Sequence, residues 1–467
     1  MRGYPIYKAS GKDGLGEIST HWVLVPLKRF VSINNEVLSE DTPSDFEILY
    51  IDIGNVDEGG IVTTPERLRF GQAPSRARRI VKQGDTIIST VRTYLKAIAF
   101  IQDNTPSLVA STGFAVLSPK GNMCAKYLSY LVRGHTFISQ VSANSYGVSY
   151  PAITSNRLGC LKIVMTENKE EQEAIVTFLD RTLAMIDRFI TNKKRLIELL
   201  KKQKIAIINR AVTQGLNPHM PMKPSGIEHI EEIPAHWEVK RAKYIFREIN
   251  ERSETGLETH LSMSQKLGLV ETDRIEEKTL QSETQEGFKL CHVDDLVLNR
   301  LKAHLGVFAR ATISGLVSPD YTVFRLNVEA NVHYFETLYK HPAYVAAFNK
   351  AVRGIVVGFL RLYTSEFYDI RTLFPPKEEQ DRIMSFIRDE TVKIDHIISR
   401  ANREIELIKE YRTKLINDVV TGKLDVRGVE LPEIEENNNL TLLDNETIND
   451  GLEDNEELIE EGIYADD

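Results

Sequence analysis

The sequence lacks the features of a secreted or membrane-anchored protein. Its three cysteines, Cys124, Cys160 and Cys291, lie far apart, without a C-x-x-C pair or a neighbouring set of histidines. We therefore expect reduced thiols, as in a cytoplasmic protein. The first residues, MRGYPIYKASGKDG, contain no apolar stretch of the signal-peptide type. No run of about 18 apolar residues occurs, and Ile355–Leu360 is far too short to span a bilayer, so we expect a soluble protein without a membrane partner.

Motifs for catalysis are also missing. There is no G-x-x-x-x-G-K-[ST] phosphate loop, and the eleven histidines show no H-E-x-x-H or comparable metal spacing. The nearest string to the Pro-Pro-aromatic loop of an amino-methyltransferase is Leu373-Phe-Pro-Pro-Lys377. Its aromatic residue is on the wrong side and no Asn or Asp precedes the prolines, so we interpret it as the turn that starts a helix. We expect no catalytic residues, no metal ligands and no cofactor in this chain.

Acidic residues outnumber basic ones, 67 to 58, but the excess is confined to one segment. The formal net charge of the 467 residues is −9. Residues 426–467 contain fifteen Asp or Glu and one basic residue, Arg427, which gives −14 and leaves +5 on residues 1–425. An acidic segment with few aromatic residues is predicted to be disordered, while the mildly basic body permits nucleic-acid binding.

Two long segments repeat each other and organise the rest of the chain. Residues 169–217 and 377–425 align without a gap at an offset of 208 residues, and about nineteen of the 49 aligned pairs are identical. Their apolar residues step by threes and fours, which predicts a narrow coiled-coil seam on a helix about 65 Å long. We expect the two helices to pair antiparallel, with Lys204 and Arg412 interrupting the seam at matching places and fixing its register. By itself this pattern is compatible with a purely structural coiled coil.

The segments before each helix share a frame but little else. Glu232-Ile-Pro-Ala-His-Trp237 matches Glu17-Ile-Ser-Thr-His-Trp22, and Asp295-Leu-Val-Leu-Asn-Arg300 matches Asp85-Thr-Ile-Ile-Ser-Thr90. Short apolar runs bounded by Gly, Pro, Asn or Asp predict strands joined by turns, with some helix, in a mixed α/β block rather than a βαβ run. We place the blocks at 1–165 and 218–374, the helices at 166–217 and 375–425, and the acidic tail at 426–467. Two copies with a common frame and different interiors predict two different ligands.

In these features the chain resembles the specificity subunit of Type I restriction–modification systems. The resemblance rests on the Glu-Ile-(Pro/Ser)-x-His-Trp openings, on Gly84-Asp85 and Asp294-Asp295 before an apolar triplet, and on Pro375-Pro376-Lys-Glu-Glu-Gln380. It also includes the helix end Val420-Thr-Gly-Lys-Leu-Asp425 and covers residues 17–427. Two departures are the first helix entry, Glu167-Asn-Lys-Glu-Glu-Gln172, which lacks the double proline, and the long acidic tail.

The resemblance implies an α+β fold, with two target-recognition domains separated by two helices that form an antiparallel coiled coil. It also implies a non-catalytic, cytoplasmic subunit that reads a bipartite target in double-stranded DNA. Two methyltransferase (M) subunits would methylate adenine, and restriction/translocase (R) subunits would join for cleavage. S-adenosylmethionine, ATP and Mg²⁺ would be bound by these partner subunits.

Base reading needs Arg, Asn or Gln at a groove edge, and phosphate binding needs Lys, Arg, Ser or Thr. Loops of both blocks carry such residues. The candidate DNA-binding residues of the first block are Arg76, Arg78, Arg79, Lys82, Thr90, Arg92, Thr93, Tyr94, Lys96, Asn144, Tyr146, Ser149 and Tyr150. Those of the second block are Asn299, Arg300, Lys302, His304, Arg353, Arg361, Tyr363 and Thr364.

Other interpretations of the same residues stay open at this point. Any one of the candidates could be an ordinary surface residue, and Tyr146 and Tyr150 could be core aromatics. For Asp85, Asp294 and Asp295 we favour a turn or capping role over acid–base chemistry. We assign the repeated His-Trp pairs to packing. The alternative function is a duplicated coiled-coil scaffold that binds protein without DNA specificity.

Overall fold

The computed structural model describes residues 3–11, 16–57, 59–264, 267–275, 285–354 and 360–430. Among the described residues the chain forms two compact units, one made of residues 3–194 with 402–430 and the other of residues 195–401. The predicted disordered tail lies outside the described residues from position 431 onward, as does most of the apolar stretch Ile355–Leu360. No helix in the described part of the chain is long and apolar enough to cross a membrane.

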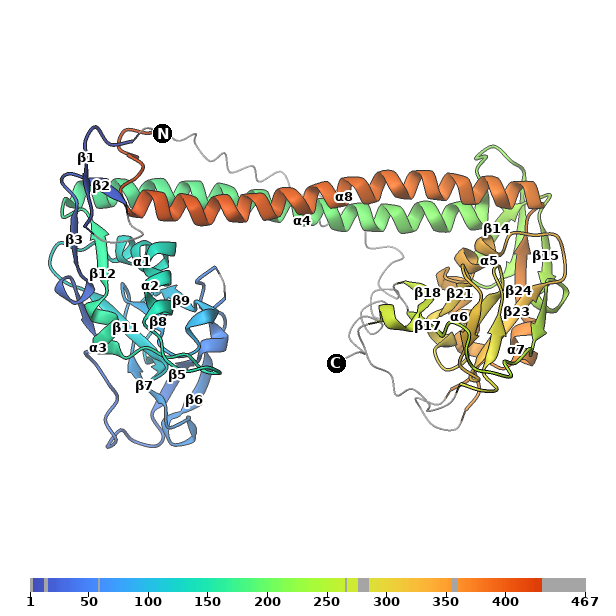
Figure 1. Cartoon of the computed structure of the whole chain (residues 1–467), viewed down its shortest axis with the longest axis horizontal. Coiled ribbons are helices and arrows are strands. Elements are labelled where there is room, and N and C mark those ends of the chain that lie inside the picture. The colour runs from blue at the N-terminus through green and yellow to red at the C-terminus, as the bar shows by residue number, and fades with distance from the viewer. Residues whose placement is uncertain are drawn as a thin grey trace. The chain divides into compact units, whose positions relative to one another are not determined.

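The two repeated segments form the two longest helices, α4 (Lys169–Gln214) and α8 (Lys377–Val420). Each begins at its Lys-Glu-Glu-Gln motif, whose two glutamates favour the positive end of the helix dipole. In both units the helices pack side by side and antiparallel, since the end of one helix meets the start of the other (Figure 1). The predicted coiled coil is thus confirmed.

The first domain, which precedes α4, is built on two four-stranded sheets. The antiparallel sheet has the order β4 (Val31–Ile33), β11 (Phe114–Pro119), β8 (Thr86–Ser89) and β9 (Ile98–Phe100). The mixed sheet has the order β6 (Glu66–Arg69), β5 (Glu47–Ile51), β10 (Leu108–Ser111) and β7 (Ala77–Ile80), with β5 and β10 parallel.

Smaller elements complete the first domain. Two strand pairs are β1 (Tyr7–Ala9) with β2 (Glu17–Ser19) and β3 (Val23–Pro26) with β12 (Lys162–Met165). The helices are α1 (Ala125–Arg133), α2 (His135–Ala143) and α3 (Ser155–Cys160).

The second domain, which precedes α8, repeats most of this topology, with two two-stranded sheets in place of the mixed four-stranded sheet. Its four-stranded antiparallel sheet has the order β16 (Phe246–Ile249), β23 (Tyr321–Leu326), β20 (Leu296–Asn299) and β21 (Phe308–Arg310). The two-stranded sheets are β13 (Met222–Ile227) with β14 (Ile230–Pro234), β15 (Glu238–Arg241) with β24 (Arg371–Phe374), β17 (Leu261–Ser264) with β18 (Gly268–Glu271), and β19 (Lys289–Cys291) with β22 (Gly315–Val317).

Its helices are α5 (Val332–Leu338), α6 (Pro342–Ala351) and α7 (Thr364–Asp369), at the places that α1, α2 and α3 occupy in the first domain. The shared strand order shows that the duplication extends through the domains. The predicted α+β fold is confirmed.

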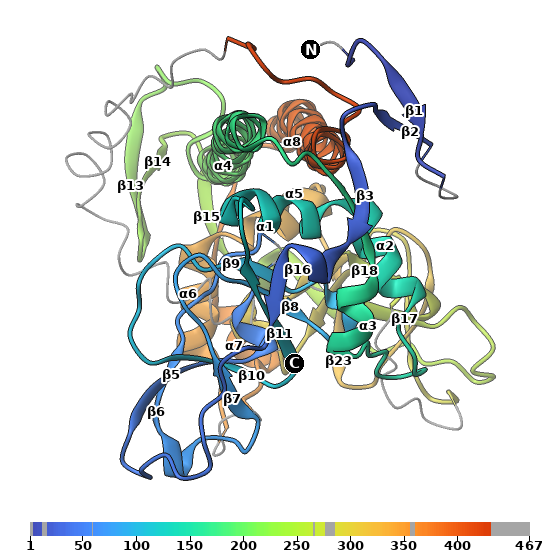
Figure 2. The same ribbon diagram turned by 90° about the vertical axis from the view of Figure 1, so that its left-hand side faces the viewer.

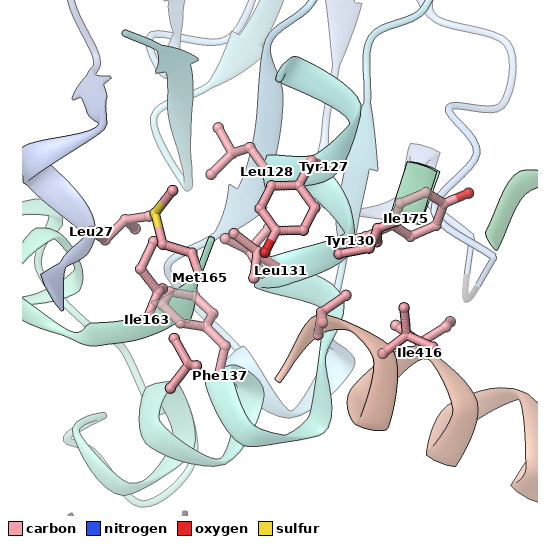
Figure 3. Close-up of a cluster of buried hydrophobic side chains, with 14 of the residues drawn as sticks. Leu27, Tyr127, Leu128, Tyr130, Leu131, Phe137, Ile163, Met165, Ile175 and Ile416 are labelled. Carbon is pink, nitrogen blue, oxygen red and sulfur yellow. The ribbon is translucent and has the colours of Figure 1, made fainter. Parts of the chain in front are cut away.

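One hydrophobic core joins each domain to both helices. In the first unit, Leu131 of α1 lies between Met165 of β12 and Ile416 of α8 (Figure 3). In Figures 1 and 2, α1 lies between the helix pair and the antiparallel sheet of the first domain. Each fully buried Leu, Ile or Met side chain stabilises such a core by roughly 1.5–3 kcal/mol. The domain is therefore fixed to the helices by the same kind of packing that holds its own elements together.

Candidate nucleic-acid interface

The repeated sequence motifs hold the start of each long helix on its domain. Gln172 donates from Nε2 to the Thr166 carbonyl (2.9 Å) and accepts at Oε1 from the backbone N–H of Cys124 (2.8 Å). Gln380 makes the equivalent bonds to Pro375 and Asn331, both at 2.8 Å. The missing double proline in the first copy is replaced by an N-cap, because Asn168 accepts from the backbone N–H of Glu171 (3.1 Å).

The His-Trp pairs lie at the same joints, which are the places where each domain meets the start of its long helix. They do not belong to the loops that carry the candidate DNA-binding residues. Trp22 and Trp237 are fully buried. His21 contacts Glu171 at 3.0 Å, and His236 contacts Glu379 at 2.6 Å. The structure thus places both pairs in packing contacts with the helices.

The acidic residues at the strand entries shape turns. Asp85 accepts a hydrogen bond from the backbone N–H of Lys82, and Asp295 accepts one from that of His292, each at 2.8 Å. Asp294 has a positive φ of 68° and pairs with Arg310 at 3.0 Å. These contacts agree with the turn role that we favoured for Asp85 and Asp295.

In the first domain, two candidate loops that are far apart in the sequence meet at the end of β8. The backbone N–H of Ile153 donates to the Thr90 carbonyl (2.8 Å), and Tyr146 pairs with Ala152 across a tight loop (2.9 Å in both directions). The residues of these loops that are exposed to solvent are Arg92, Tyr94, Leu95, Lys96, Tyr146, Val148, Ser149 and Tyr150. The exposure of Tyr146 and Tyr150, 65% and 64%, excludes a role as core aromatics.

Two arginine guanidinium groups of this surface lie over aromatic rings. The Arg92 guanidinium lies 4.9 Å from the centre of the Tyr150 ring, and that of Arg157 lies 4.7 Å from the centre of the Tyr146 ring. Such contacts orient a cation without neutralising its charge. Arg157, in α3, also donates to the Asn144 side chain (3.0 Å). It was missed from the sequence, where only its place in the polar run Thr154-Ser-Asn-Arg157 distinguished it.

Several first-domain candidates are engaged in holding loops together. Thr90 donates to the Gly113 carbonyl (2.9 Å) and Thr93 to the Ser145 hydroxyl (3.0 Å), and both threonines are buried. We expect these two residues to position the loop rather than to touch DNA directly. Their place in the interface stays a prediction.

The basic cluster at 76–82 divides between separate partners. Arg76 pairs with Asp52 (2.6 Å) and Lys82 with Glu36, whereas Arg78 lies over the Phe70 ring at 4.7 Å. Arg79 is half-buried, and burial lowers the pKa of its guanidinium. The cluster is therefore less available for phosphate than its sequence suggests, apart from Arg78.

In the second domain, the corresponding loops meet in the same way. The backbone N–H of Leu362 donates to the Arg300 carbonyl (3.2 Å), and Arg353 pairs with Arg361 in both directions (3.0 and 2.9 Å). Lys302 and Tyr363 are exposed here, and His304 belongs to the 3₁₀ turn Ala303–Leu305. The backbone contacts of both domains thus bring their candidate loops to equivalent places on the frame.

On the second surface the arginines contact carboxylates rather than aromatic rings. Arg300 and Arg361 both contact Asp320, at 3.3 and 3.5 Å, and Arg353 contacts Glu366 at 3.1 Å.

Two other second-domain candidates serve the loop itself. The Asn299 side chain accepts from the backbone N–H groups of Leu301 (3.1 Å) and Lys302 (3.3 Å), and Thr364 donates to Glu248 (2.6 Å). In the part of the chain that the structure describes, no three His, Cys, Asp or Glu side chains gather as metal ligands.

No protein-family model matches the chain. Over 357 residues, 74% of this chain and 79% of the relative, it is 23% identical to a protein of Methanocaldococcus jannaschii provisionally named the type I restriction enzyme MjaX specificity subunit. It is 28% identical over 170 residues, 35% of this chain and 36% of the relative, to the type I restriction enzyme MjaIX specificity subunit of the same organism.

Solved structures show the same fold. A chain from a structure of complex assembly and conformational transition in the type I R-M system matches with a TM-score of 0.67 at 18% identity, over 87% of this chain and 99% of that one. The crystal structure of the HsdS subunit from Thermoanaerobacter tengcongensis matches with a TM-score of 0.55 at 19% identity, over 88% of this chain and all of that one. The resemblance predicted from the sequence is therefore confirmed: the chain is similar in sequence to Type I restriction enzyme specificity subunits and has their fold.

Proposed function

We propose that the chain is the DNA sequence-recognition subunit of a Type I restriction–modification complex. One observation carries this function: a duplicated frame presents two loop surfaces at equivalent places, and the surfaces differ in the side chains that a DNA groove would meet. Arg300 and Arg361 on one surface, and Arg92, Lys96 and Tyr150 on the other, are residue types that contact bases and phosphates. Each domain would read one half of a bipartite target.

The chemistry would be supplied by partner subunits. We propose that two methyltransferase subunits dock on the helical frame, bind S-adenosylmethionine and methylate adenine N6 in each half-site. Restriction subunits with ATP and Mg²⁺ would add translocation and cleavage. This division of labour is supported by the absence of phosphate-loop and methyltransferase motifs from the sequence. The chain itself would be non-catalytic, and its two long helices would set the length of the unread spacer.

The test is to produce the chain with its methyltransferase subunits in a host that lacks adenine methylation, and to map the modified adenines across the genome. A bipartite motif with one modified adenine in each half is expected. Duplex binding by the same complex should prefer that motif and should weaken steeply as salt rises, because phosphate contacts release counterions. A protein-binding scaffold, the alternative, would show no preference among DNA sequences at any salt.

A further inference from the structure

Asp320 lies where the two candidate loops of the second domain meet. It belongs to a turn in which Tyr321 N–H donates to the Ser318 carbonyl (2.9 Å) and Asp320 N–H donates to the Ser318 hydroxyl (3.3 Å), directly before β23. Its side chain is half exposed and faces two arginines, Arg300 after β20 and Arg361 from the later loop. One carboxylate thus connects both loops at the surface.

Arg300 holds in place the turn that carries the Asp320 carboxylate. Its Nε donates to the Asp320 carbonyl (2.7 Å), and Nη2 contacts both the Asp320 carboxylate (3.3 Å) and the Pro319 carbonyl (3.4 Å). Three contacts from one guanidinium, whose side chain is 24% exposed, fix the turn that carries Asp320. Most of the hydrogen-bonding capacity of Arg300 is therefore used within the protein.

Arg361 is the freer of the two. Its backbone is held by the pairing with Arg353, and the next residue, Leu362, is fully buried. Its guanidinium meets Asp320 through Nη2 alone, at 3.5 Å, and its Nε is buried without a hydrogen-bond partner among the described residues. The side chain is 37% exposed, so Asp320 orients a guanidinium whose Nη1 and Nη2 N–H groups, rather than the buried Nε–H, are left for a ligand.

The first domain cannot build this arrangement. At the equivalent places it has Thr90, Gly113 and Ala152, and the Thr90 hydroxyl donates to the Gly113 carbonyl just as Arg300 donates to that of Asp320. Here the frame is shared, while the two guanidinium groups and the carboxylate occur only in the second domain. The arrangement is therefore specific to the second domain and is not required by the frame that the two domains share.

We propose that Arg361 reads a guanine in the second half-site. Asp320, held in place by Arg300, is the positioning residue that orients the Arg361 guanidinium. An oriented guanidinium matches the O6 and N7 acceptors of guanine through two parallel hydrogen bonds, and a carboxylate behind it limits its rotation. The proposal rests on the proposed function, which it deepens by naming one base of the target.

The experiment uses the full chain assembled with its methyltransferase subunits. Dissociation constants are measured for the preferred duplex and for duplexes in which each base pair of the second half-site is replaced in turn. The second half-site is the half that changes when residues 218–374 are exchanged for the corresponding segment of another specificity subunit. The proteins are the unmodified chain, Arg361→Lys, which keeps the charge but not the fork, Arg361→Ala, which removes both, and Asp320→Asn. Arg241→Lys is the matched control, because Arg241 also pairs with a carboxylate, Asp369 (3.5 Å), but belongs to β15 and not to either loop.

The unmodified complex should prefer guanine at one position of that half-site. Arg361→Lys should reduce the preference at this position on the order of 5- to 150-fold, and Asp320→Asn should reduce it less, at the same position only. Arg241→Lys should not alter it. Thermal unfolding of each variant separates these effects from a loss of folding.

Three results would overturn the inference while leaving the proposed function intact. The first is a second half-site without a G·C pair. The second is a guanine preference that survives Arg361→Lys. The third is that Arg361→Ala weakens binding to all duplexes equally and lowers its salt dependence, as the loss of a phosphate contact would. A complex with no sequence preference at all would instead refute the proposed function.

Discussion

The two domains join the long helices through equivalent residues, but the buried polar groups of the first joint have more hydrogen-bond partners than those of the second. In the first, the buried Glu171 carboxylate accepts from the Tyr4 hydroxyl (2.7 Å) and Trp22 Nε1 (3.2 Å), from Thr166, and contacts His21 (3.0 Å).

In the second joint, Glu379 contacts His236 at 2.6 Å. The buried Trp237 Nε1 has no partner among the described residues.

The ends of the helices differ in the same direction. In the first unit, Asn417 near the end of α8 accepts from the backbone N–H (3.0 Å) and hydroxyl (2.8 Å) of Thr136. Its counterpart in the repeat, Asn209, lines an open cleft of about 1000 Å³ in the second unit, together with His341 and Phe386. A repeated motif therefore fixes where a residue lies, whereas its contribution to stability depends on neighbours that have diverged.

The largest expected difference between the joints concerns their glutamates. Glu171→Gln removes the charge and leaves buried donors without an acceptor, which should destabilise the first unit by roughly 2–4 kcal/mol. Glu379→Gln removes one partly exposed contact and should cost less than about 1 kcal/mol. Native-state hydrogen exchange in β3 and β12, compared with β15 and β24, measures each unit separately. Equal losses from the two substitutions would remove the distinction between the joints.

Acid should weaken the first joint through the same carboxylate. Burial raises the pKa of Glu171, but hydrogen bonds from Thr166, Tyr4, Trp22 and His21 lower it more, so the pKa lies below its ordinary value. The stabilisation is thus present above about pH 4.3, the ordinary Glu pKa, and is lost as the pH falls through the lower folded-state pKa. The stability difference between the unmodified chain and Glu171→Gln should shrink over this range. A difference that stays constant with pH contradicts the assignment.

The tryptophans give a smaller contrast. Trp22→Phe and Trp237→Phe remove similar volume from fully buried sites, but only the first also removes a hydrogen bond to a carboxylate. We expect Trp22→Phe to cost about 1.5–3 kcal/mol more than Trp237→Phe, measured by the same exchange experiment. The reverse order would show that Trp237 Nε1 is better satisfied than its surroundings indicate.

The smallest effects should be equal in the two units. Lys204 pairs with Asp395 at 2.7 Å, and Arg412 pairs with Asp187 at 2.8 Å, so both residues predicted to interrupt the seam have carboxylate partners related by the repeat. Double-mutant cycles for these exposed pairs should each give about 0.2–1 kcal/mol. Clearly unequal values would mean that the asymmetry extends from the joints into the helix pair.

The sequence was sufficient for the frame because its signals are local and repeated. The seam spacing predicted α4 and α8, and short runs such as Thr86–Ser89 correspond to a strand residue by residue. The positions of Lys204 and Arg412 were predicted, but not their partners, since nothing in one helix specifies which residue of the other lies opposite.

The candidate interface was only partly predictable from the sequence. Residue type identified Arg300 and Arg361, but it could not show that both contact Asp320, because that depends on how three segments meet. For the same reason Thr90, Thr93 and Asn299 looked like surface candidates although they are buried.

The most direct test of two independent readers on one frame is to exchange residues 218–374 for the corresponding segment of another specificity subunit. The methylated motif is then mapped with the same methyltransferase subunits. We predict that one half of the bipartite motif changes, while the other half and the spacer length stay as they were. A change in both halves, or loss of one half without a replacement in a folded complex, would contradict the account.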